Sequence, residues 1–197
     1  MLQSNGKYFN QVFDNFNLEN PEIFENIEFE KCEFTSCNLS GCGFKNCKFL
    51  DCNFTKNNLS NLQISGSIFN GNNFYESKLL GIDFAKSSQR LGFSSNFYNC
   101  ILDLCNFSQM DLKGIIIQNC SCREVYFSDT NLTKANLTGN DFDGATFHKT
   151  NFTKANLEGA KNYKINPFDN TLSQAKFNLP EAISILETLE IKLKWAE

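Results

Sequence analysis

The amino-acid sequence predicts an all-β solenoid in which the chain coils repeatedly around one apolar axis. An apolar residue returns at every fifth position from Phe24 to Phe84, and again from Phe97 to Leu157. A period of five fits neither the 3.6 residues of a helical turn nor the two-residue alternation of a flat strand. The 21 Phe, against 5 Tyr and 1 Trp, suit a dry, stacked interior because a phenylalanine ring carries no polar group. We therefore expect one solenoid domain over residues 1–197.

The repeat spacing also predicts the shape of each coil. The pentads Thr133–Leu137 and Thr153–Leu157 are identical and lie twenty residues apart, which is four pentads. We therefore expect square coils whose sides stack directly on the next turn. Glycines two places after a central residue mark a corner that needs an unusual backbone conformation. These glycines are Gly41, Gly66, Gly71, Gly81, Gly114, Gly139, Gly144 and Gly159.

The phase of the repeat divides the chain into segments. Residues 1–23 are expected to form an irregular first coil that caps the stack, because the spacing of the centres lengthens near Pro21. Residues 22–86 form a first repeat block, and residues 95–159 form a second. Between them, residues 85–96 break the phase and are rich in Ser and Gly, which predicts a loop.

Residues 160–197 leave the repeat and begin with a connecting segment. A proline at a first helical turn, followed by apolar residues at helical spacing, predicts a short helix over roughly Pro180–Leu189. Apolar residues then alternate with lysines, which predicts a final strand at Ile191, Leu193 and Trp195. A helix this short is marginal in water by itself. Its apolar stripe is therefore expected to cap the open end of the stack, to bind a second copy of the chain, or both.

Composition excludes several classes of protein. The net charge of −4 argues against a nucleic-acid binder held by counterion release. The sequence has no run of 18 apolar residues, which argues against a membrane span. The start of the sequence lacks the basic region and the apolar stretch of a secretory signal. Nine cysteines without such a signal are expected to be reduced thiols, which predicts a cytoplasmic protein.

The cysteines and the single histidine do not form a catalytic or metal-binding pattern. On a four-sided coil, cysteines spaced by five fall on successive sides, so only Cys32 with Cys52, and Cys100 with Cys120, are stacked. Their spacing favours packing as small buried thiols over a zinc site, and a reducing compartment disfavours a disulfide. His148 follows a central residue and should point outward. We expect no enzymatic activity, no metal and no cofactor.

The pentads resemble those of a known family. A small residue, then Asn or Asp, then Leu or Phe, as in Ala135-Asn136-Leu137, is the pattern of the pentapeptide-repeat family, and it covers roughly residues 13–159. The resemblance implies a right-handed quadrilateral parallel β-helix. The order of two blocks, an intervening loop and a C-terminal helix is similar to the quinolone-resistance subgroup. That likeness implies an elongated homodimer, joined through the C-terminal helices, which mimics duplex DNA and binds type II topoisomerases, mainly DNA gyrase.

Three groups of residues are candidate sites under this interpretation. The candidate acidic face consists of Asp103, Asp129, Asp141 and Asp143. The candidate partner-binding loop consists of Lys86, Ser87, Ser88, Gln89, Arg90 and Leu91. The candidate dimer interface consists of Ile183, Leu186, Leu189, Ile191, Leu193 and Trp195. Arg123 interrupts the acidic column, so a mixed, solvated surface is the alternative there. For the loop, the alternative is a tolerated insertion.

The sequence leaves two main functions open. The first is a DNA-mimicking protein that binds DNA gyrase and protects it from quinolones or from gyrase toxins. The second is a pentapeptide-repeat scaffold with a partner other than a topoisomerase. An enzyme with its site on the loop is a remote third.

Overall fold

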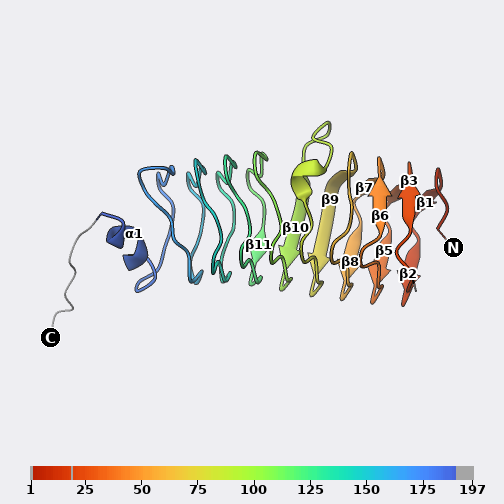
Figure 1. The fold of residues 1–197 in the computed structure, drawn as a ribbon, viewed down its shortest axis with the longest axis horizontal. Helices are drawn as coiled ribbons and strands as arrows, with labels where there is room; N and C mark the ends of the chain where they lie inside the picture. Colours follow the sequence, from red (N-terminus) through yellow and green to blue (C-terminus); the bar gives the residue numbers. More distant parts are fainter. Residues whose placement is uncertain (1, 19, 190–197) are drawn as a thin grey trace.

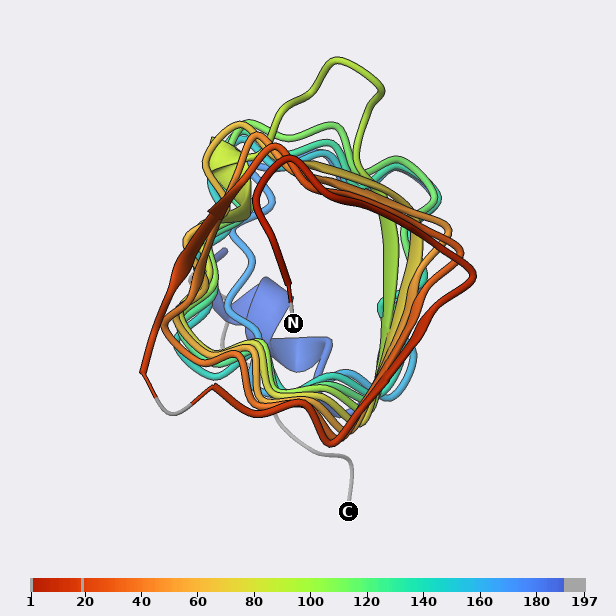
Figure 2. The ribbon, with the colours of Figure 1, turned by 90° about the vertical axis from the view of Figure 1, so that its right-hand side faces the viewer.

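The computed structural model describes residues 2–18 and 20–189, which form a long rod (Figure 1). Seen along its axis, the chain coils around a four-sided outline (Figure 2). The strands and helices are β1 (Lys7–Phe9), β2 (Val12–Asp14), β3 (Ile23–Glu25), β4 (Glu28–Glu30), β5 (Glu33–Thr35), β6 (Gly43–Lys45), β7 (Lys48–Leu50), β8 (Asn53–Thr55), β9 (Ile68–Tyr75), the 3₁₀ helix η1 (Phe84–Lys86), β10 (Ser94–Tyr98), β11 (Ile117–Gln118) and α1 (Ile183–Glu187). The predicted solenoid is therefore confirmed.

Each side of the coil stacks on the same side of the next coil. β7 pairs in parallel with β9 so that Phe49 lies beside Phe69, and β8 pairs with β9 so that Phe54 lies beside Phe74. These partners are four pentads apart, as the identical pentads predict. Beyond β11 the sides shorten to single parallel bridges with the same spacing, such as Asn136 with Asn156. The backbone ladder thus runs along the whole rod.

Two coils are longer than four pentads. Near the N-terminus Phe13 lies beside Phe34, so this coil carries one additional residue. At the loop Phe74 lies beside Phe97, and this coil is longer still. At the loop the additional residues lie on one side of the coil, between Ser88, whose amide bonds to Ser67, and Ser94, which lies beside Asn70. The central residues before and after them stay aligned.

Every predicted central residue is buried, and many of the rings stack along the axis. In one column Phe34, Phe54 and Phe74 lie with ring centroids 4.7 and 4.6 Å apart and nearly parallel planes. Rings on adjacent sides of the same coil meet edge to face, as Phe44 and Phe49 do at 5.4 Å. Both arrangements are favourable for aromatic pairs. The result is one continuous apolar interior.

The N-terminal end of this interior is partly closed by the chain itself. Residues 2–6 turn inward over the opening (Figure 2), and Leu2 is only 5% exposed. Tyr8 stacks on Phe29 at 5.3 Å and extends the column by one position that the sequence pattern did not include. Tyr8 lies five residues before Phe13, but the additional residue in this coil puts it out of phase with the series that begins at Phe24.

The corners require a left-handed backbone, as the glycine positions predict. Gly66 has a φ of +70°, and a Cβ there would collide with the Asn46 side chain of the preceding coil. Asn46 itself occupies the same kind of corner with a φ of +53°. Glycine and asparagine tolerate this region better than other residues do.

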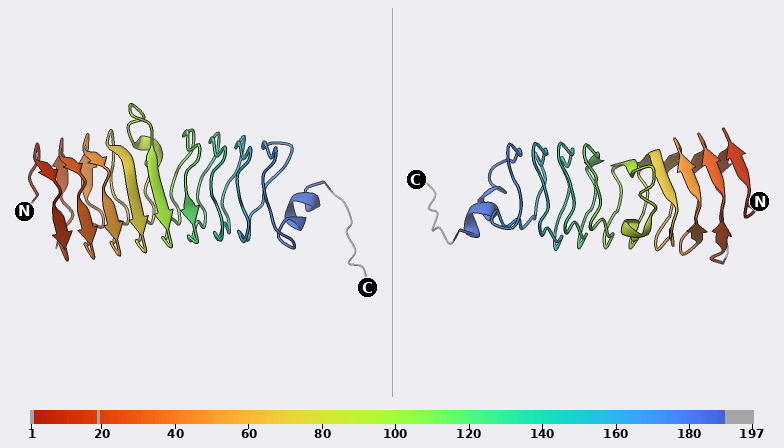
Figure 3. Two further views of the ribbon diagram at one scale, coloured as in Figure 1. Left: turned by 180° about the vertical axis from the view of Figure 1, so that it is seen from behind. Right: turned by 90° about the horizontal axis from the view of Figure 1, so that it is seen from above.

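At the C-terminal end α1 lies beyond the last coil (Figure 3). The helix is shorter than the predicted Pro180–Leu189, since it spans only Ile183–Glu187. Ile185 packs against the core, and the Ser184 hydroxyl donates a hydrogen bond to the Tyr163 carbonyl at 3.1 Å. The helix therefore covers part of the open end. The predicted final strand at Ile191, Leu193 and Trp195 lies outside the described residues.

Candidate functional site

The loop is shorter than the interruption of the repeat at residues 85–96 predicts. η1 continues the coil, and the Ser87 hydroxyl donates to the Phe84 carbonyl at 2.7 Å. The Ser88 amide donates to the Ser67 carbonyl at 2.8 Å, as in an ordinary ladder. Lys86, Ser87 and Ser88 therefore belong to the wall of the coil, and the predicted partner-binding loop is reduced to its second half.

The part that projects is the turn of residues 89–92, which stands out from the coil outline (Figure 2). The Gly92 amide donates to the Gln89 carbonyl at 3.0 Å, and the Asn70 side chain donates to the Leu91 carbonyl at 3.2 Å. Gln89 and Arg90 are exposed, and Leu91 is 59% exposed. A short turn with anchored ends thus presents a cationic and an apolar side chain to solvent.

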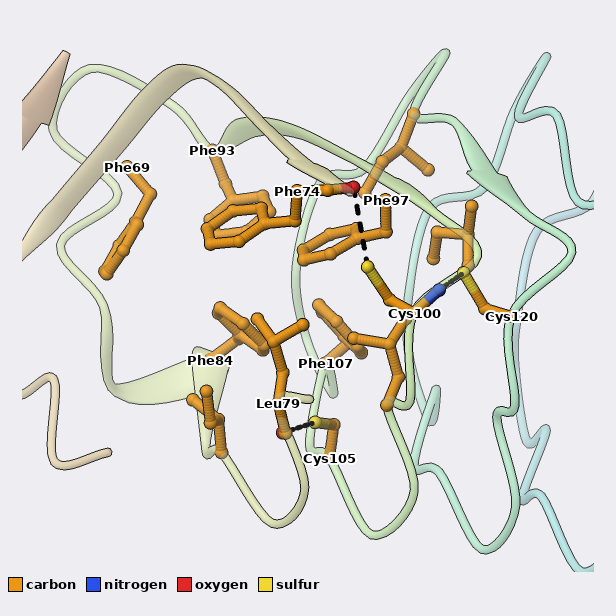
Figure 4. Close-up of a cluster of buried hydrophobic side chains, with 14 of the residues drawn as sticks. Phe69, Phe74, Leu79, Phe84, Phe93, Phe97, Cys100, Cys105, Phe107 and Cys120 are labelled. Carbon is orange, nitrogen blue, oxygen red and sulfur yellow. Dashed lines mark hydrogen bonds between the residues drawn. The ribbon is translucent and has the colours of Figure 1, made fainter. Parts of the chain in front are cut away.

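Phe93 shows where the predicted loop of residues 85–96 is wrong. Its ring is buried and lies 5.5 Å from Phe84 and 6.3 Å from Phe69 (Figure 4). It fills the core position that the strict count assigned to a polar residue. The sequence pattern missed it because neither the step from Phe84 to Phe93 nor the step from Phe93 to Phe97 is a multiple of five.

The candidate acidic residues do not form one face. Asp141 is buried, and its carboxylate accepts hydrogen bonds from Arg123 at 2.9 Å and from Asn162 at 2.7 Å. Burial raises the pKa of Asp141, but the hydrogen bonds from Asn162 and Arg123 outweigh it and hold the pKa below its ordinary value. The expectation that Asp141 faces solvent as an acid of the DNA-mimic surface is therefore corrected: the carboxylate is neutralised within the protein.

The other three acids have different surroundings. Asp103 accepts hydrogen bonds from the Ser121 hydroxyl at 2.6 Å and from the Arg123 amide at 3.0 Å. Asp129 and Asp143 are exposed, but they lie on neighbouring sides of the coil. Among the described residues these four acids consequently do not make a continuous negative stripe.

Acids near the N-terminus are also mixed with lysines. Glu28 lies 2.9 Å from Lys48 and 4.0 Å from Lys7. The hydrogen bond from Lys48 holds the pKa of Glu28 below its ordinary value. These pairs reduce the local negative charge at this end.

The candidate dimer interface lies at the C-terminal end of the rod. Leu186 is 39% exposed, while Ile183 and Leu189 are half-buried. Leu179, just before the helix, is 76% exposed. The remaining residues of this group, Ile191, Leu193 and Trp195, lie outside the described part of the chain.

The nine cysteines are all buried and unpaired. Burial raises the pKa of Cys52 and of Cys105 to about 12, so both thiols are protonated at neutral pH. The Cys100 amide donates to the Cys120 sulfur at 3.3 Å (Figure 4). Over residues 2–18 and 20–189, no three His, Cys, Asp or Glu side chains converge as metal ligands would. His148 is exposed and lies 3.9 Å from Asp169.

One surface escaped the sequence analysis. Ile101, Leu104 and Tyr126 are large apolar or aromatic residues at outward positions, and each is at least 40% exposed. The sequence could have indicated them, because most outward positions of the repeat carry polar residues and these three do not.

None of the helices in the described segments is long and apolar enough to cross a bilayer.

Comparison with known proteins identifies the repeat. The family model described as pentapeptide repeats matches eight copies, over residues 24–71 and 120–159, which is a little under half of the chain. A search of curated protein sequences gives no match.

Several solved structures have a similar fold. HetL, a pentapeptide repeat protein involved in heterocyst differentiation regulation from the cyanobacterium Nostoc sp. strain PCC 7120, is 14% identical, with 85% of each chain covered and a TM-score of 0.52. Two structures of QnrB1, a plasmid-mediated fluoroquinolone resistance protein, are also similar. One trypsin-treated variant is 21% identical over 95% of this chain and 100% of that one, with a TM-score of 0.49. The full-length form is 22% identical over 94% and 100%, with a TM-score of 0.48.

The coil runs without a break through residues 72–119, between the two matched segments. Residues 24–71 and 120–159 match the family model and are pentapeptide repeats. Because the coil continues between them, the chain that carries them forms one quadrilateral parallel β-helix.

Proposed function

We propose that this protein binds a type II topoisomerase, with DNA gyrase as the first candidate, and protects it from quinolones or from gyrase-directed toxins. The protein would act as a rigid, non-enzymatic rod in the cytoplasm. The proposal rests on the resemblance of the chain to the quinolone-resistance subgroup in the order of its blocks, loop and C-terminal helix.

The observation that carries the proposal is the projecting turn of residues 89–92. The coil holds it at both ends, through Ser88 on one side and the buried Phe93 on the other. Loops held by a rigid scaffold commonly provide specific contacts. Arg90 and Leu91 offer one cationic and one apolar contact to a partner, and neither is needed for the interior.

In this proposal negative charge contributes less to partner recognition than it would on a surface that mimicked DNA throughout. Asp103, Asp129 and Asp143 are the acids that would contribute to mimicry, while Asp141 is neutralised by Arg123. We therefore propose that shape and the turn provide most of the recognition, and that the acids add long-range attraction.

We also propose that the protein is a homodimer joined at the C-terminal helix. Leu186 and Leu179 expose apolar surface at that end of the rod. Leu186→Glu should give monomers in light scattering because it places a carboxylate in the contact. A dimer that persists in this variant would place the interface elsewhere.

A supercoiling assay with purified gyrase, ciprofloxacin and this protein tests the topoisomerase. We expect the protein to restore supercoiling in the presence of the drug, or to inhibit the enzyme at higher dose. Neither effect at any dose, with the protein folded and its oligomeric state unchanged, would reject gyrase as the partner.

The contribution of the turn can be separated from its length. Deleting residues 89–91 removes the extra length of this coil and should restore the spacing of four pentads, so the fold should survive. The matched control is the full-length double variant Arg90→Ser and Leu91→Ser, which keeps the length and changes the chemistry. Loss of protection in both variants, with unchanged melting, would assign recognition to these side chains; full protection in both would make the turn a spacer.

A second candidate function is a scaffold for another protein partner. The mixed charges favour it, since Asp129 and Asp143 lie on neighbouring sides and Arg123 neutralises Asp141. A protein that is folded and dimeric but inactive with both gyrase and topoisomerase IV would favour this scaffold.

A further inference from the structure

A hollow of about 310 Å³ lies at a corner of the coil. Gly81 forms part of its floor, because this corner has no side chain at that level. In the next coil the same corner carries Leu104, and the Tyr126 ring stands on the adjoining side. Asp83 and Asn106 provide polar groups at the edge. The hollow is therefore apolar and aromatic with one carboxylate.

Leu104 occupies this corner against its conformational preference. Its φ is +62°, in the left-handed region that disfavours residues with a bulky side chain. In the two preceding coils the same corner holds Asn61, with a φ of +57°, and then Gly81, with a φ of +72°. Leu104 is also 46% exposed, so the core does not require it. Left-handed backbone is common at the corners of this coil, as at Gln109 with a φ of +63° and Lys134 with a φ of +61°, so Leu104 differs from them by its exposed apolar side chain. An exposed leucine beside a hollow is typical of a contact with another molecule.

The polar groups of the hollow suit a cation. The Asn106 side-chain amide donates a hydrogen bond to one carboxylate oxygen of Asp83 at 2.9 Å. The other carboxylate oxygen lies 3.2 Å from the Lys86 ammonium. The Asp83 and Lys86 side chains are 33% and 69% exposed, and ion pairs with this exposure contribute little. Another cation can therefore replace Lys86 at low cost. Asp103, next to Leu104 in the chain, and Glu124, at the same corner one coil further on, add negative charge nearby, which Arg123 partly offsets.

We propose that this hollow binds an arginine side chain, flanked by apolar residues, from a protein partner. The guanidinium would lie against the Tyr126 ring and donate hydrogen bonds to Asp83, while the neighbouring apolar residue contacts Leu104. Asp83 and Tyr126 lie on the same side of the rod, one coil before and one coil after Asn106. A planar guanidinium offers both a face for the ring and N–H donors for the carboxylate, whereas an ammonium is a compact point charge. The inference does not depend on which protein the partner is, and it stands apart from the turn of residues 89–92.

Nuclear magnetic resonance tests the site with the whole protein. The probe is the tripeptide acetyl-Leu-Arg-Leu-amide, and the matched peptide carries citrulline, the uncharged isostere, in place of arginine. We expect saturable amide shifts near Leu104, Asn106 and Tyr126, with about tenfold weaker binding of the citrulline peptide. Absent shifts, equal binding of the two peptides, or shifts spread over all acidic surfaces would overturn the proposal.

Variants separate the site from general electrostatics. Lys86→Met should strengthen binding about threefold because it frees Asp83, whereas Lys176→Met makes the same charge change far away and should have no effect. Leu104→Asn should keep the fold, since asparagine suits this backbone, and should weaken binding about fivefold. An equal gain in both lysine variants, or unchanged binding in Leu104→Asn, would count against the site.

Discussion

Replacing Phe54 by alanine should destabilise the protein more than a typical core truncation does. The ring is 3% exposed and lies between Phe34 at 4.7 Å and Phe74 at 4.6 Å, with ring planes within 5° and 10°. Truncating a buried phenylalanine costs about 3–5 kcal/mol, and each stacked pair adds about 0.5–1.5 kcal/mol beyond burial. Because Phe54 loses two stacked partners, we expect a loss near the upper end of that range.

Two matched variants show which part of the cost comes from stacking. Phe54→Leu keeps most of the apolar volume but loses both ring pairs, and should cost about 1–2 kcal/mol. Phe13 is half-buried at the N-terminal end and has one stacked partner, Phe34 at 4.7 Å. Phe13→Ala should therefore cost about 1–2 kcal/mol as well.

Guanidinium unfolding followed by far-ultraviolet circular dichroism measures the three differences in free energy. Hydrogen exchange locates them, because coils contact only their neighbours and protection should fall first around β5, β8 and β9. A cost for Phe54→Ala no larger than that for Phe13→Ala would refute the claim that an unbroken stack of rings holds the rod together.

Three further predictions concern thiols, pH and corners. The buried Cys105 thiol, with its pKa raised to about 12, should react with Ellman's reagent only on unfolding; fast labelling of the native protein would contradict its burial. The folded pKa of Asp141 is lowered, so its contribution to stability is present above the unfolded pKa of about 3.9 and is lost as pH falls through the folded pKa. In urea unfolding, Asp141→Asn should therefore be most destabilising near neutral pH, and a difference from the unmodified protein that persists in strong acid would contradict the pairing. Both Gly114→Ala and Gly66→Ala place alanine at positive φ and should cost about 1–2 kcal/mol. Thermal unfolding should show a larger loss for Gly66→Ala, whose Cβ would meet Asn46; an equal loss would mean that Asn46 moves aside freely.

The interior of this protein could be predicted from the sequence because the fold reuses one environment. Each central residue, such as Phe49 or Phe127, faces the same buried axis and must be apolar. The apolar pattern is therefore recognisable even where the other positions of the pentad vary. The glycine corners were predictable for a similar reason, because glycine adopts a left-handed backbone readily. Corners that carry other residues, such as Lys134 and Gln109, could not be recognised in this way. Repetition gives many independent observations of one rule.

What could not be predicted lies where the period changes. Phe93 is a core residue and Tyr8 packs against the core, in the two coils that exceed four pentads. A count by fives passes over Phe93 from either side, and it reaches Tyr8 from Phe13 but not from Phe29. The stacking partner of each ring depends on how many additional residues its coil contains. That length is set by backbone geometry, which the apolar pattern does not record.

The outward surface was harder to predict for a physical reason that also identifies its unusual positions. A solvent-facing position on a rigid coil accepts almost any polar residue. The spacing therefore predicts an outward Asp141, whereas in the structure Arg123 and Asn162 donate hydrogen bonds to its carboxylate and enclose it. Residues that violate a local rule carry more information there. Leu104 is bulky, exposed and left-handed, at a corner where Asn61 fits without strain. Since nothing in the interior requires that leucine, an exposed apolar side chain at this corner is better explained by a contact outside the protein.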